Sequence, residues 1–396
     1  MTASDVVVVG GGIAGLRTIE RLRGGSFAGS ITMVGSEAHL PYDRPPLTKQ
    51  VLRGERDLPA LREEYDTLGV ETFLGRTATA LDVGSKTITL SDGTRLGYTS
   101  LVLATGARPR LLPGLAPRPG LHVLRAYDDA LALREAVRAR GAITIVGGGF
   151  IGCEVAASAR MMGARATIVE ALPAPLIRVA GKAASDEIVA LHERHGVEII
   201  SGLAVADVLG QTRVSGLRLA DGRELPAEDV LLALGVVPDL DWLTGSGVRL
   251  EDGVVCDAGG RTSAPDVYAV GDVARWWHPL ADGHRRVEHW TSAVDQAAVV
   301  AANIVAGPGE PVTELADVPY FWSDQYDVKI QALGFIDADA DTDMLHTGER
   351  AVVVYSRDGV VTGVLGFSAA RAVMRTRALI AERARLGKVV DLLTAR

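Results

Sequence analysis

The chain contains two copies of one glycine fingerprint, and each copy follows a short apolar run. The first copy, Gly10-Gly11-Gly12-Ile13-Ala14-Gly15, follows residues 6–9, and the second, Gly147-Gly148-Gly149-Phe150-Ile151-Gly152, follows residues 143–146. Both runs are rich in β-branched residues, as buried parallel strands are, and both fingerprints open into segments with helical spacing. In a strand–turn–helix context the first glycine permits the tight turn, the second lets a pyrophosphate approach the backbone, and the third lets helix and strand pack closely. Glycines also make ordinary turns, but two copies in the same context predict two dinucleotide-binding units.

Length and composition are those of a multidomain globular protein. A chain of 396 residues exceeds the usual size of a single core, so two or three domains are expected. The net charge of −8 argues against general binding of nucleic acid. No apolar stretch reaches about 18 residues and the N-terminus has no signal-peptide pattern, so we expect a cytoplasmic protein without a membrane segment. The two cysteines, Cys153 and Cys256, form no CxxC or zinc pattern, so neither a metal site nor a disulfide framework is expected.

The order of the motifs predicts an α/β fold in which two Rossmann-like domains are nested. A strand over residues 30–34 closes the first βαβ unit, a hairpin over residues 87–98 turns at Asp92-Gly93, and residues 101–104 form a buried strand. The second unit runs from residue 143 to a closing strand over residues 229–234, and a further sheet strand ends at Gly271-Asp272. We expect a first dinucleotide domain over residues 1–110 and 241–310, a second over 111–240, and a C-terminal α+β domain over 311–396.

Glu170 indicates which nucleotide the second fingerprint binds. It ends the strand over residues 166–169, where a carboxylate accepts the ribose 2′-OH of NAD and repels a 2′-phosphate. The residues that follow, Ala171-Leu172-Pro173, include no arginine to bind that phosphate. NADH is therefore predicted over NADPH, although a glutamate at a strand end can also be merely solvated.

Motifs along nearly the whole chain resemble one family, the FAD-dependent, NADH-dependent ferredoxin reductases of the putidaredoxin reductase type. The glycine motifs, Ala104-Thr105-Gly106 and Gly271-Asp272 are generic to its two-dinucleotide flavoprotein superfamily. Two segments are far more specific to this branch, namely Pro41-Tyr42-Asp43-Arg44-Pro45-Pro46-Leu47-Thr48-Lys49 and Phe321-Trp322-Ser323-Asp324-Gln325-Tyr326. Leu124-Arg125, Glu154 and Val287-Glu288-His289-Trp290 complete the resemblance.

The resemblance implies which residues contact each cofactor. The expected FAD positions are Gly10, Gly12, Ile13, Ala14, Gly15, Ser36, Glu37, Arg44, Lys49, Ala78, Ala104, Thr105, Gly106, Arg125, Gly271, Asp272, Glu288, His289 and Trp290. The expected NADH positions are Gly147, Gly149, Phe150, Ile151, Gly152, Glu170 and Gly235. Many relatives carry an acid where this chain has Ser36, so the FAD ribose contact falls either to Ser36 or to Glu37.

Three residues are expected at the reaction itself: Lys49, Glu154 and Trp322. Hydride transfer needs stacked rings and little acid–base help, so the protein mainly provides proximity and orientation. The sequence alone favours a solvated surface lysine at Lys49, whereas the family resemblance implies that Lys49 places a positive charge near the flavin. Glu154 is either the carboxylate partner of Lys49 or a complement to the helix dipole. Trp322 and Trp290 either flank the flavin or belong to the core.

The absence of a redox thiol narrows the reaction. Disulfide reductases of this superfamily carry a cysteine pair after the first ribose-binding strand, whereas His39 to Lys49 here contain none. Cys153 is expected to pack against the sheet instead. Without such a thiol, electrons must leave directly from the flavin. The family resemblance then implies transfer of electrons from NADH through FAD to a ferredoxin that serves a cytochrome P450 or a ring-hydroxylating oxygenase, by a monomer or weak dimer. Reduction of a small molecule such as a quinone, or redox sensing by a flavoprotein, are the alternatives.

Overall fold

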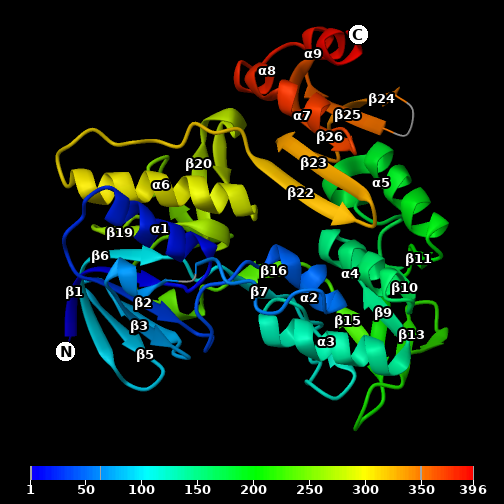
Figure 1. Ribbon diagram of the computed structural model, residues 1–396, viewed down its shortest axis with the longest axis horizontal. Helices are drawn as coiled ribbons and strands as arrows, with labels where there is room; N and C mark the ends of the chain where they lie inside the picture. The colour runs from blue at the N-terminus through cyan, green and yellow to red at the C-terminus, as the bar shows by residue number, and fades with distance from the viewer. Residues whose placement is uncertain (1, 63, 348–349, 396) are drawn as a thin grey trace. The chain divides into compact units, whose positions relative to one another are not determined.

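A computed structural model describes residues 2–62, 64–347 and 350–395 of the protein (Figure 1). Its contacts divide the chain into two compact units, each assembled from three stretches. Unit 1 comprises Met1–Asp43, Ala60–Arg108 and Val237–Pro319, and unit 2 comprises Arg44–Pro59, Pro109–Val236 and Tyr320–Arg396. The units are described separately below.

Unit 1 is built on a sheet whose central strands are parallel. The strand order is β3-β2-β1-β6-β5-β4, and β19 pairs with β6. The strands are β1 (Thr2–Val9), β2 (Ile31–Gly35), β3 (Val70–Leu74), β4 (Ala78–Asp82), β5 (Thr87–Leu90), β6 (Arg95–Leu103) and β19 (Val267–Ala269). In β1, Val6 lies opposite both Ile31 of β2 and Ser100 of β6. Residues 6–9 are buried on both faces of the sheet, which explains their unbroken apolar run.

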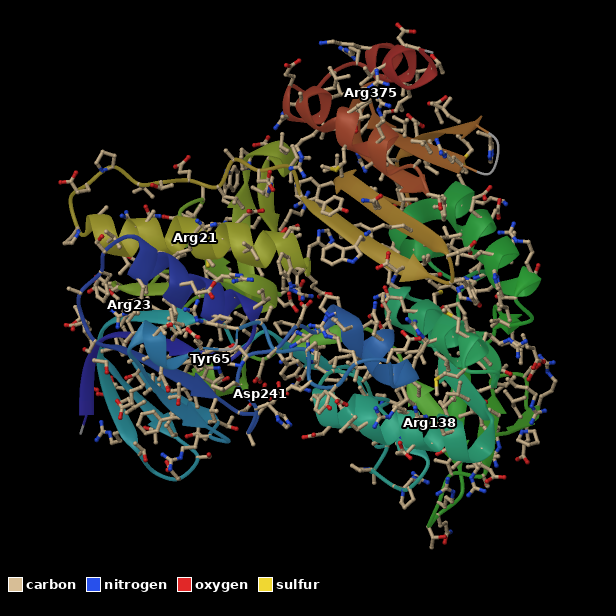
Figure 2. All side chains as sticks on the ribbon, viewed as in Figure 1. Arg21, Arg23, Tyr65, Arg138, Asp241 and Arg375 are labelled. Carbon is tan, nitrogen blue, oxygen red and sulfur yellow. The ribbon has the colours of Figure 1, made fainter. Side chains whose placement is uncertain are left out.

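Two helices lie side by side against this sheet (Figure 1): α1 (Ile13–Gly24) and α6 (Trp290–Ala306). Arg23, in the last turn of α1, donates to the carbonyls of Phe27, Gly29 and Leu68 at 2.7–2.8 Å and so fixes the end of this helix (Figure 2). A second sheet of this unit has the order β17-β18-β20-β21. Its strands are β17 (Leu250–Glu251), β18 (Gly253–Cys256), β20 (Ala274–His278) and β21 (Gly283–Arg285).

Unit 2 has a parallel sheet of its own, with the order β11-β10-β9-β15-β8. Its strands are β8 (Leu121–His122), β9 (Ala142–Val146), β10 (Arg165–Glu170), β11 (Glu198–Ser201) and β15 (Val230–Leu232). The helices of this part are α3 (Tyr127–Arg140), α4 (Phe150–Met161) and α5 (Ile177–Arg194). A smaller antiparallel sheet contains β12 (Val205–Leu209), β13 (Gly216–Leu219) and β14 (Glu224–Pro226).

The C-terminal part of unit 2 is an antiparallel sheet with helices. The order β22-β23-β26-β25-β24 uses β22 (Tyr320–Gln325), β23 (Val328–Gly334), β24 (Asp341–Thr347), β25 (Arg350–Arg357) and β26 (Val360–Phe367). The helices α7 (Ala370–Arg375) and α8 (Arg377–Ala381) pack on β23 and β26, and α9 (Leu386–Thr394) packs on β25 and β26.

The proline-rich segment joins unit 2 through a short helical turn. A 3₁₀ turn over Pro45–Thr48 leads into α2 (Gln50–Arg53), which packs against α3 and α4. Proline is tolerated here because the first positions of a helix need no N–H donor. The prolines predict that helical structure begins only at the end of this segment, whereas the 3₁₀ turn already begins at Pro45.

The predicted α/β class, with parallel Rossmann-like sheets and a C-terminal antiparallel sheet, is confirmed. The predicted hairpin turning near Asp92 is present, since β5 and β6 pair antiparallel. The second strand of this hairpin and the buried strand after it, which were predicted as two strands, form one continuous strand, β6. Within the described residues, no helix is both long and apolar enough to cross a membrane.

Candidate functional site

The first glycine loop, in unit 1, has the shape that a pyrophosphate needs. A side chain on Gly10, whose φ is +132°, would collide with the carbonyl oxygen of Ala104, and one on Gly15 would collide with the carbonyl oxygen of Gly10. At Gly12, by contrast, an added Cβ would meet no described atom within 4 Å. The loop is therefore closed on the side of the sheet and open on the side where a phosphate would lie.

The second glycine loop, in unit 2, repeats this geometry. A Cβ on Gly147 (φ +108°) would collide with Ala233, and one on Gly152 would collide with Gly147, while the surroundings of Gly149 are open as far as the structure describes them. The N–H groups of Gly10 and Gly147 make equivalent hydrogen bonds of 2.8 Å to Val34 and Val169. The fingerprint thus builds the same cradle twice, once in each unit.

Each cradle ends in a helix N-terminus without a side-chain cap. The N-cap residues of α1 and α4 are Gly12 and Gly149, which have no side chain to bind the first N–H groups. Those first turns carry Ile13 and Ala14 in α1, and Phe150 and Ile151 in α4. Backbone donors at the positive end of a helix suit a pyrophosphate, so both cradles fit a dinucleotide.

One acidic residue lies at or just beyond the end of the second strand in each βαβ unit. Glu170 is the last residue of β10, and its carboxylate accepts the N–H groups of Gly148 at 2.6 Å and Leu172 at 2.8 Å. Glu37 follows β2 and accepts the hydroxyl of Tyr42 at 2.5 Å, while Ser36 beside it is exposed. The structure does not choose between Ser36 and Glu37 as the ribose contact, which remains a prediction.

Several expected FAD positions gather at the carboxyl edge of the sheet in unit 1. Ala104, Thr105 and Gly106 directly follow β6, and the carbonyl of Ala104 lies against Gly10. Gly271 and Asp272 follow β19 in a 3₁₀ turn. A Cβ on Gly271 would lie 3.0 Å from the methyl group of Ala14, so this turn borders the first glycine loop. Ligands of doubly wound sheets bind at this edge.

The remaining expected FAD positions of unit 1 are spread more widely. Ala78 begins β4 at one end of the sheet order and is buried. Glu288 forms an ion pair with Arg286. His289 is the N-cap of α6, and burial lowers the pKa of its imidazole to about 4. Trp290 begins α6 and donates its indole N–H to Asp43 at 2.9 Å.

Three other expected cofactor positions belong to unit 2. The guanidinium of Arg44 donates to the carbonyl of Arg125 at 2.5 Å, and the N–H of Arg125 donates to Asp129 at 3.0 Å. Gly235 follows β15 with a φ of +85°, and its carbonyl accepts the N–H of Arg110 at 2.9 Å.

Lys49 and Glu154 form a buried ion pair in unit 2, with 2.6 Å between Nζ and Oε2. Only 5% of Lys49 and 7% of Glu154 are exposed, which excludes a solvated surface lysine. The carboxylate also accepts the hydroxyl of Thr48 at Oε2 and that of Ser323 at Oε1, each at 2.6 Å. Burial of an ion pair is tolerated when further hydrogen bonds satisfy both partners, as they do here.

Thr48 and Ser323 are the site residues that sequence reasoning missed. Both lie inside the two most specific motifs, so the motifs themselves were the available signal. Trp322, next to Ser323 on β22, stacks on Tyr320 with 6.1 Å between ring centroids and 24° between the planes. The ring of Phe150 meets that of Phe321 edge-on, with 5.0 Å between centroids.

The cysteines lie away from solvent. Cys153 and Cys256 are free thiols with at most 1% exposed surface, and burial raises the pKa of both. A thiol needs exposure and a low pKa to act as a nucleophile. Cys153 packs in α4, as predicted. No group of histidine, cysteine, aspartate and glutamate side chains with the geometry of a metal site occurs in the described part of the chain.

Comparisons with known proteins agree with this architecture. The family described as pyridine nucleotide-disulphide oxidoreductase matches residues 4–297, and the family described as reductase C-terminal matches residues 320–391. The fold and the paired cradles define a dinucleotide-dependent oxidoreductase, and the chain belongs to the pyridine nucleotide-disulphide oxidoreductase family.

The individual relatives of this chain narrow the class further, to ferredoxin reductases. A probable ferredoxin reductase, CtmF, of Castellaniella defragrans is 37% identical over 92% of this chain and 90% of its own length. The ferredoxin–NAD(+) reductase component of the p-cumate 2,3-dioxygenase system of Pseudomonas putida is 37% identical over 84% of this chain and 81% of its own length. A solved covalent complex of putidaredoxin reductase with putidaredoxin matches with a TM-score of 0.92 and 28% identity over the whole of both chains. The resemblance to the putidaredoxin reductase-type ferredoxin reductases is confirmed.

Proposed function

We propose that this protein transfers electrons from NADH through FAD to a ferredoxin. The observation that carries this proposal is the pair of equivalent glycine cradles, one in each unit, combined with cysteines that are buried and inert. Two cradles provide for an electron donor and an electron acceptor that both contain a pyrophosphate. Without a thiol relay, electrons must pass directly from the flavin to the partner.

The first cradle is assigned to FAD and the second to NADH. The chemistry supplied by bound FAD is acceptance of two electrons from NADH and their release one at a time. The chain contributes backbone donors for both pyrophosphates, and Glu170 is assigned to the 2′-OH of the NADH ribose. Lys49, with its charge balanced by Glu154, is assigned to the flavin, and Trp322 to a position beside it. The division into domains at residues 110, 240 and 310 is retained as a proposal.

The partner assignment rests on the relatives. Reductases of a dioxygenase system and of putidaredoxin resemble this chain over most or all of its length. We therefore assign a small iron–sulfur ferredoxin as the direct partner, and a ring-hydroxylating oxygenase or a cytochrome P450 as the enzyme downstream. We also propose a monomer or weak dimer that works in the cytoplasm, where NADH is formed.

The test is reconstitution of the electron-transfer chain. The purified protein is loaded with FAD and supplied with NADH, a ferredoxin from a ring-hydroxylating system, and cytochrome c as the final acceptor. Cytochrome c reduction that depends on both the reductase and the ferredoxin supports the proposal. Efficient turnover with quinones and none with any ferredoxin would favour a small-molecule reductase. A few turnovers per hour with every acceptor would favour a redox sensor.

A further inference from the structure

A chain of buried hydrogen bonds in unit 2 extends from Glu154 to the turn between β22 and β23. Ser323 Oγ lies 2.6 Å from Glu154 Oε1, and Gln325 Nε2 donates to Ser323 Oγ at 3.1 Å. His192 Nε2 lies 2.9 Å from Gln325 Oε1, and His192 Nδ1 lies 3.1 Å from the hydroxyl of Tyr326. Ser323, Gln325 and His192 are at most 1% exposed, so water does not compete for the hydrogen bonds that join these residues and Glu154, whereas the contact with Tyr326 is partly buried.

The chemistry of these groups gives every hydrogen bond the same direction. An ionised carboxylate only accepts, so Ser323 donates to Glu154 and accepts from the amide nitrogen of Gln325. The oxygen of Gln325 must then accept from His192, which places the imidazole proton on Nε2. Nδ1 of the neutral ring accepts from Tyr326. Burial lowers the pKa of His192 to about 4, in agreement with a neutral ring at pH 7.

The distal end of this chain is anchored by a residue in an unfavourable backbone conformation. Tyr326 lies in the two-residue turn between β22 and β23 with a φ of +57°, a region that bulky residues rarely adopt. Its ring stacks on that of His195, with 3.6 Å between centroids and 9° between planes. The stacking and the contact of its hydroxyl with His192 hold the turn in place.

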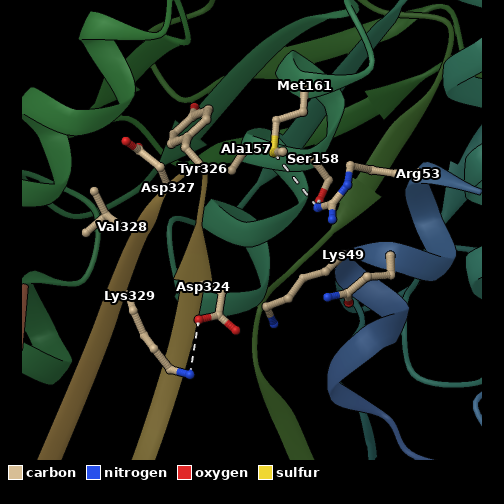
Figure 3. A pocket seen from close by; sticks show the side chains of 11 residues that line it. Lys49, Arg53, Ala157, Ser158, Met161, Asp324, Tyr326, Asp327, Val328 and Lys329 are labelled. Atoms are coloured by element: carbon tan, nitrogen blue, oxygen red, sulfur yellow. Dashed lines mark hydrogen bonds and ion pairs between the residues drawn. The ribbon is translucent and has the colours of Figure 1, made fainter. Parts of the chain in front are cut away.

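This series of hydrogen bonds is suited to holding the Glu154 carboxylate in place, and not to conducting protons. A side-chain amide relays a proton only by leaving its stable tautomer, so Gln325 interrupts any proton path from Tyr326 to Glu154. Lys49, in contrast, lines a cavity of about 230 Å³ whose wall also includes Arg53, Asp324 and Lys329 (Figure 3). Lys49 therefore borders the cavity, while the carboxylate that pairs with its Nζ is held by the hydroxyl groups of Thr48 and Ser323.

We propose that Ser323, Gln325 and His192 are positioning residues, which hold the Glu154 carboxylate, and through it the Lys49 ammonium, in the orientation used in hydride transfer from NADH. This inference rests on the proposed function, because it needs Lys49 and Glu154 at the reaction. It assigns the C-terminal sheet a direct part in the first half-reaction, in addition to any role in partner binding.

The first test measures reduction of the bound flavin by NADH in rapid-mixing experiments without ferredoxin. Ser323→Ala should lower the limiting rate about tenfold while the apparent dissociation constant of NADH changes less than about threefold. Ser323→Thr, which restores the hydroxyl, should recover most of the rate. Ser185→Ala is the matched control, because Ser185 is equally buried in unit 2 and its hydroxyl donates to the carbonyl of Pro175 at 2.6 Å. Its rate should equal that of the wild type.

The second test does not depend on turnover. In ¹⁵N spectra of histidine-labelled protein, His192 should be neutral and protonated at Nε2 between pH 6 and 8. Ser323→Ala should shift its Nε2 resonance, because the amide of Gln325 loses its acceptor, and Ser185→Ala should not. Gln325→Met keeps the side-chain length, removes both hydrogen bonds and should lower the reduction rate in the same direction, which provides a second route if Ser323→Ala folds poorly.

The outcomes separate this inference from the function on which it rests. If NADH reduces the wild type and Ser323→Ala equally fast, or if His192 carries its proton on Nδ1, the positioning chain is wrong while the proposed function stands. If NADH does not reduce the flavin of the wild type, both are overturned.

Discussion

At the scale of single residues, the carboxylate of Glu170 braces the second glycine loop, and it is also the group that we assign to the ribose of NADH. It accepts two backbone N–H groups, one of them from Gly148 in the second glycine loop. The negative charge that braces the loop is the same charge that would repel a 2′-phosphate. Under this assignment, a substitution of Glu170 changes both the nucleotide preference and the loop geometry, so two variants are needed to separate the two effects.

Glu170→Ala should narrow the preference for NADH over NADPH by at least about tenfold, on the order of 1.4 kcal/mol. Glu170→Gln keeps one oxygen to accept a loop N–H and removes only the charge, so it should narrow the preference to a similar extent with less loss of kcat. The measurement is the ratio of kcat/KM for the two nucleotides. A ratio unchanged in both variants would contradict the assignment of Glu170 to the ribose.

The two cysteines should be dispensable for electron transfer. Cys153→Ala combined with Cys256→Ala should leave the rate with ferredoxin within a few-fold of wild type, since both thiols are buried and neither is ionised at pH 7. Alanine is preferred to serine because a buried hydroxyl without a partner is destabilising. Loss of turnover with full FAD occupancy would show that a thiol takes part.

The geometry of a site residue could be predicted from the sequence where a motif carries its own context, but not where its contacts are distant. Each glycine loop is specified by about ten neighbouring residues, and its cradle is present in the structure. The partners of Glu154 are not local: Thr48 lies 106 positions before it and Ser323 lies 169 positions after it. No periodicity links such residues, so the sequence left the role of Glu154 open between ion pair and helix dipole.

At the scale of elements, α5 carries a buried histidine into the interior of unit 2. His192 is 0% exposed and lies near the end of this helix. Beside it, His195 lowers the pKa of His192 further, whereas the contact with Gln325 raises it. His278 and His289 of unit 1 likewise have a pKa near 4 because of burial. In the folded protein these three histidines are therefore neutral at pH 7.

The free energy of unfolding should fall as the pH decreases from about 6.5 to about 4. In the unfolded chain these histidines titrate near 6.5, so between the two values the unfolded state binds more protons and is favoured by acid. His192→Gln should reduce this loss, while His346→Gln, an exposed control on β24, should not. Urea unfolding of the FAD-loaded protein at pH 7, 6 and 5 measures the effect. If the free energy of unfolding falls equally with decreasing pH in the wild type and in His192→Gln, His192 does not contribute to the pH dependence.

At the scale of the whole molecule, the net charge of −8 does not favour an encounter with a ferredoxin, which we expect to be acidic. Arg285 of unit 1 is exposed, and so are Arg371 and Arg375 on α7 of unit 2. Figure 2 labels Arg375. Arg286 is different, because its guanidinium is largely buried and pairs with Asp252 and Glu288. Local groups of exposed arginines, not the net charge, are expected to steer the encounter.

The second-order rate with ferredoxin should fall steeply as salt rises, while reduction of the flavin by NADH barely changes. Arg285→Glu and Arg375→Glu should each lower the rate with ferredoxin and leave ferricyanide reduction mostly intact. Arg286→Glu should instead reduce thermal stability, because it places three acidic groups together. A ferredoxin rate that is indifferent to salt and to both exposed charges would mean that docking is apolar or uses another surface.

The interleaving of the two units has a consequence for how the protein is made. Unit 1 needs β19, which begins at Val267 and pairs with β6, and unit 2 needs β22, which begins at Tyr320 and supplies Ser323 to Glu154. During synthesis, neither unit can therefore complete its fold until these late strands have been translated. Pairings between distant segments form slowly. The nascent chain thus exposes unpaired parallel strands for much of its synthesis, and chaperone supply, more than the thermodynamic stability of the finished fold, should limit its yield in a foreign host.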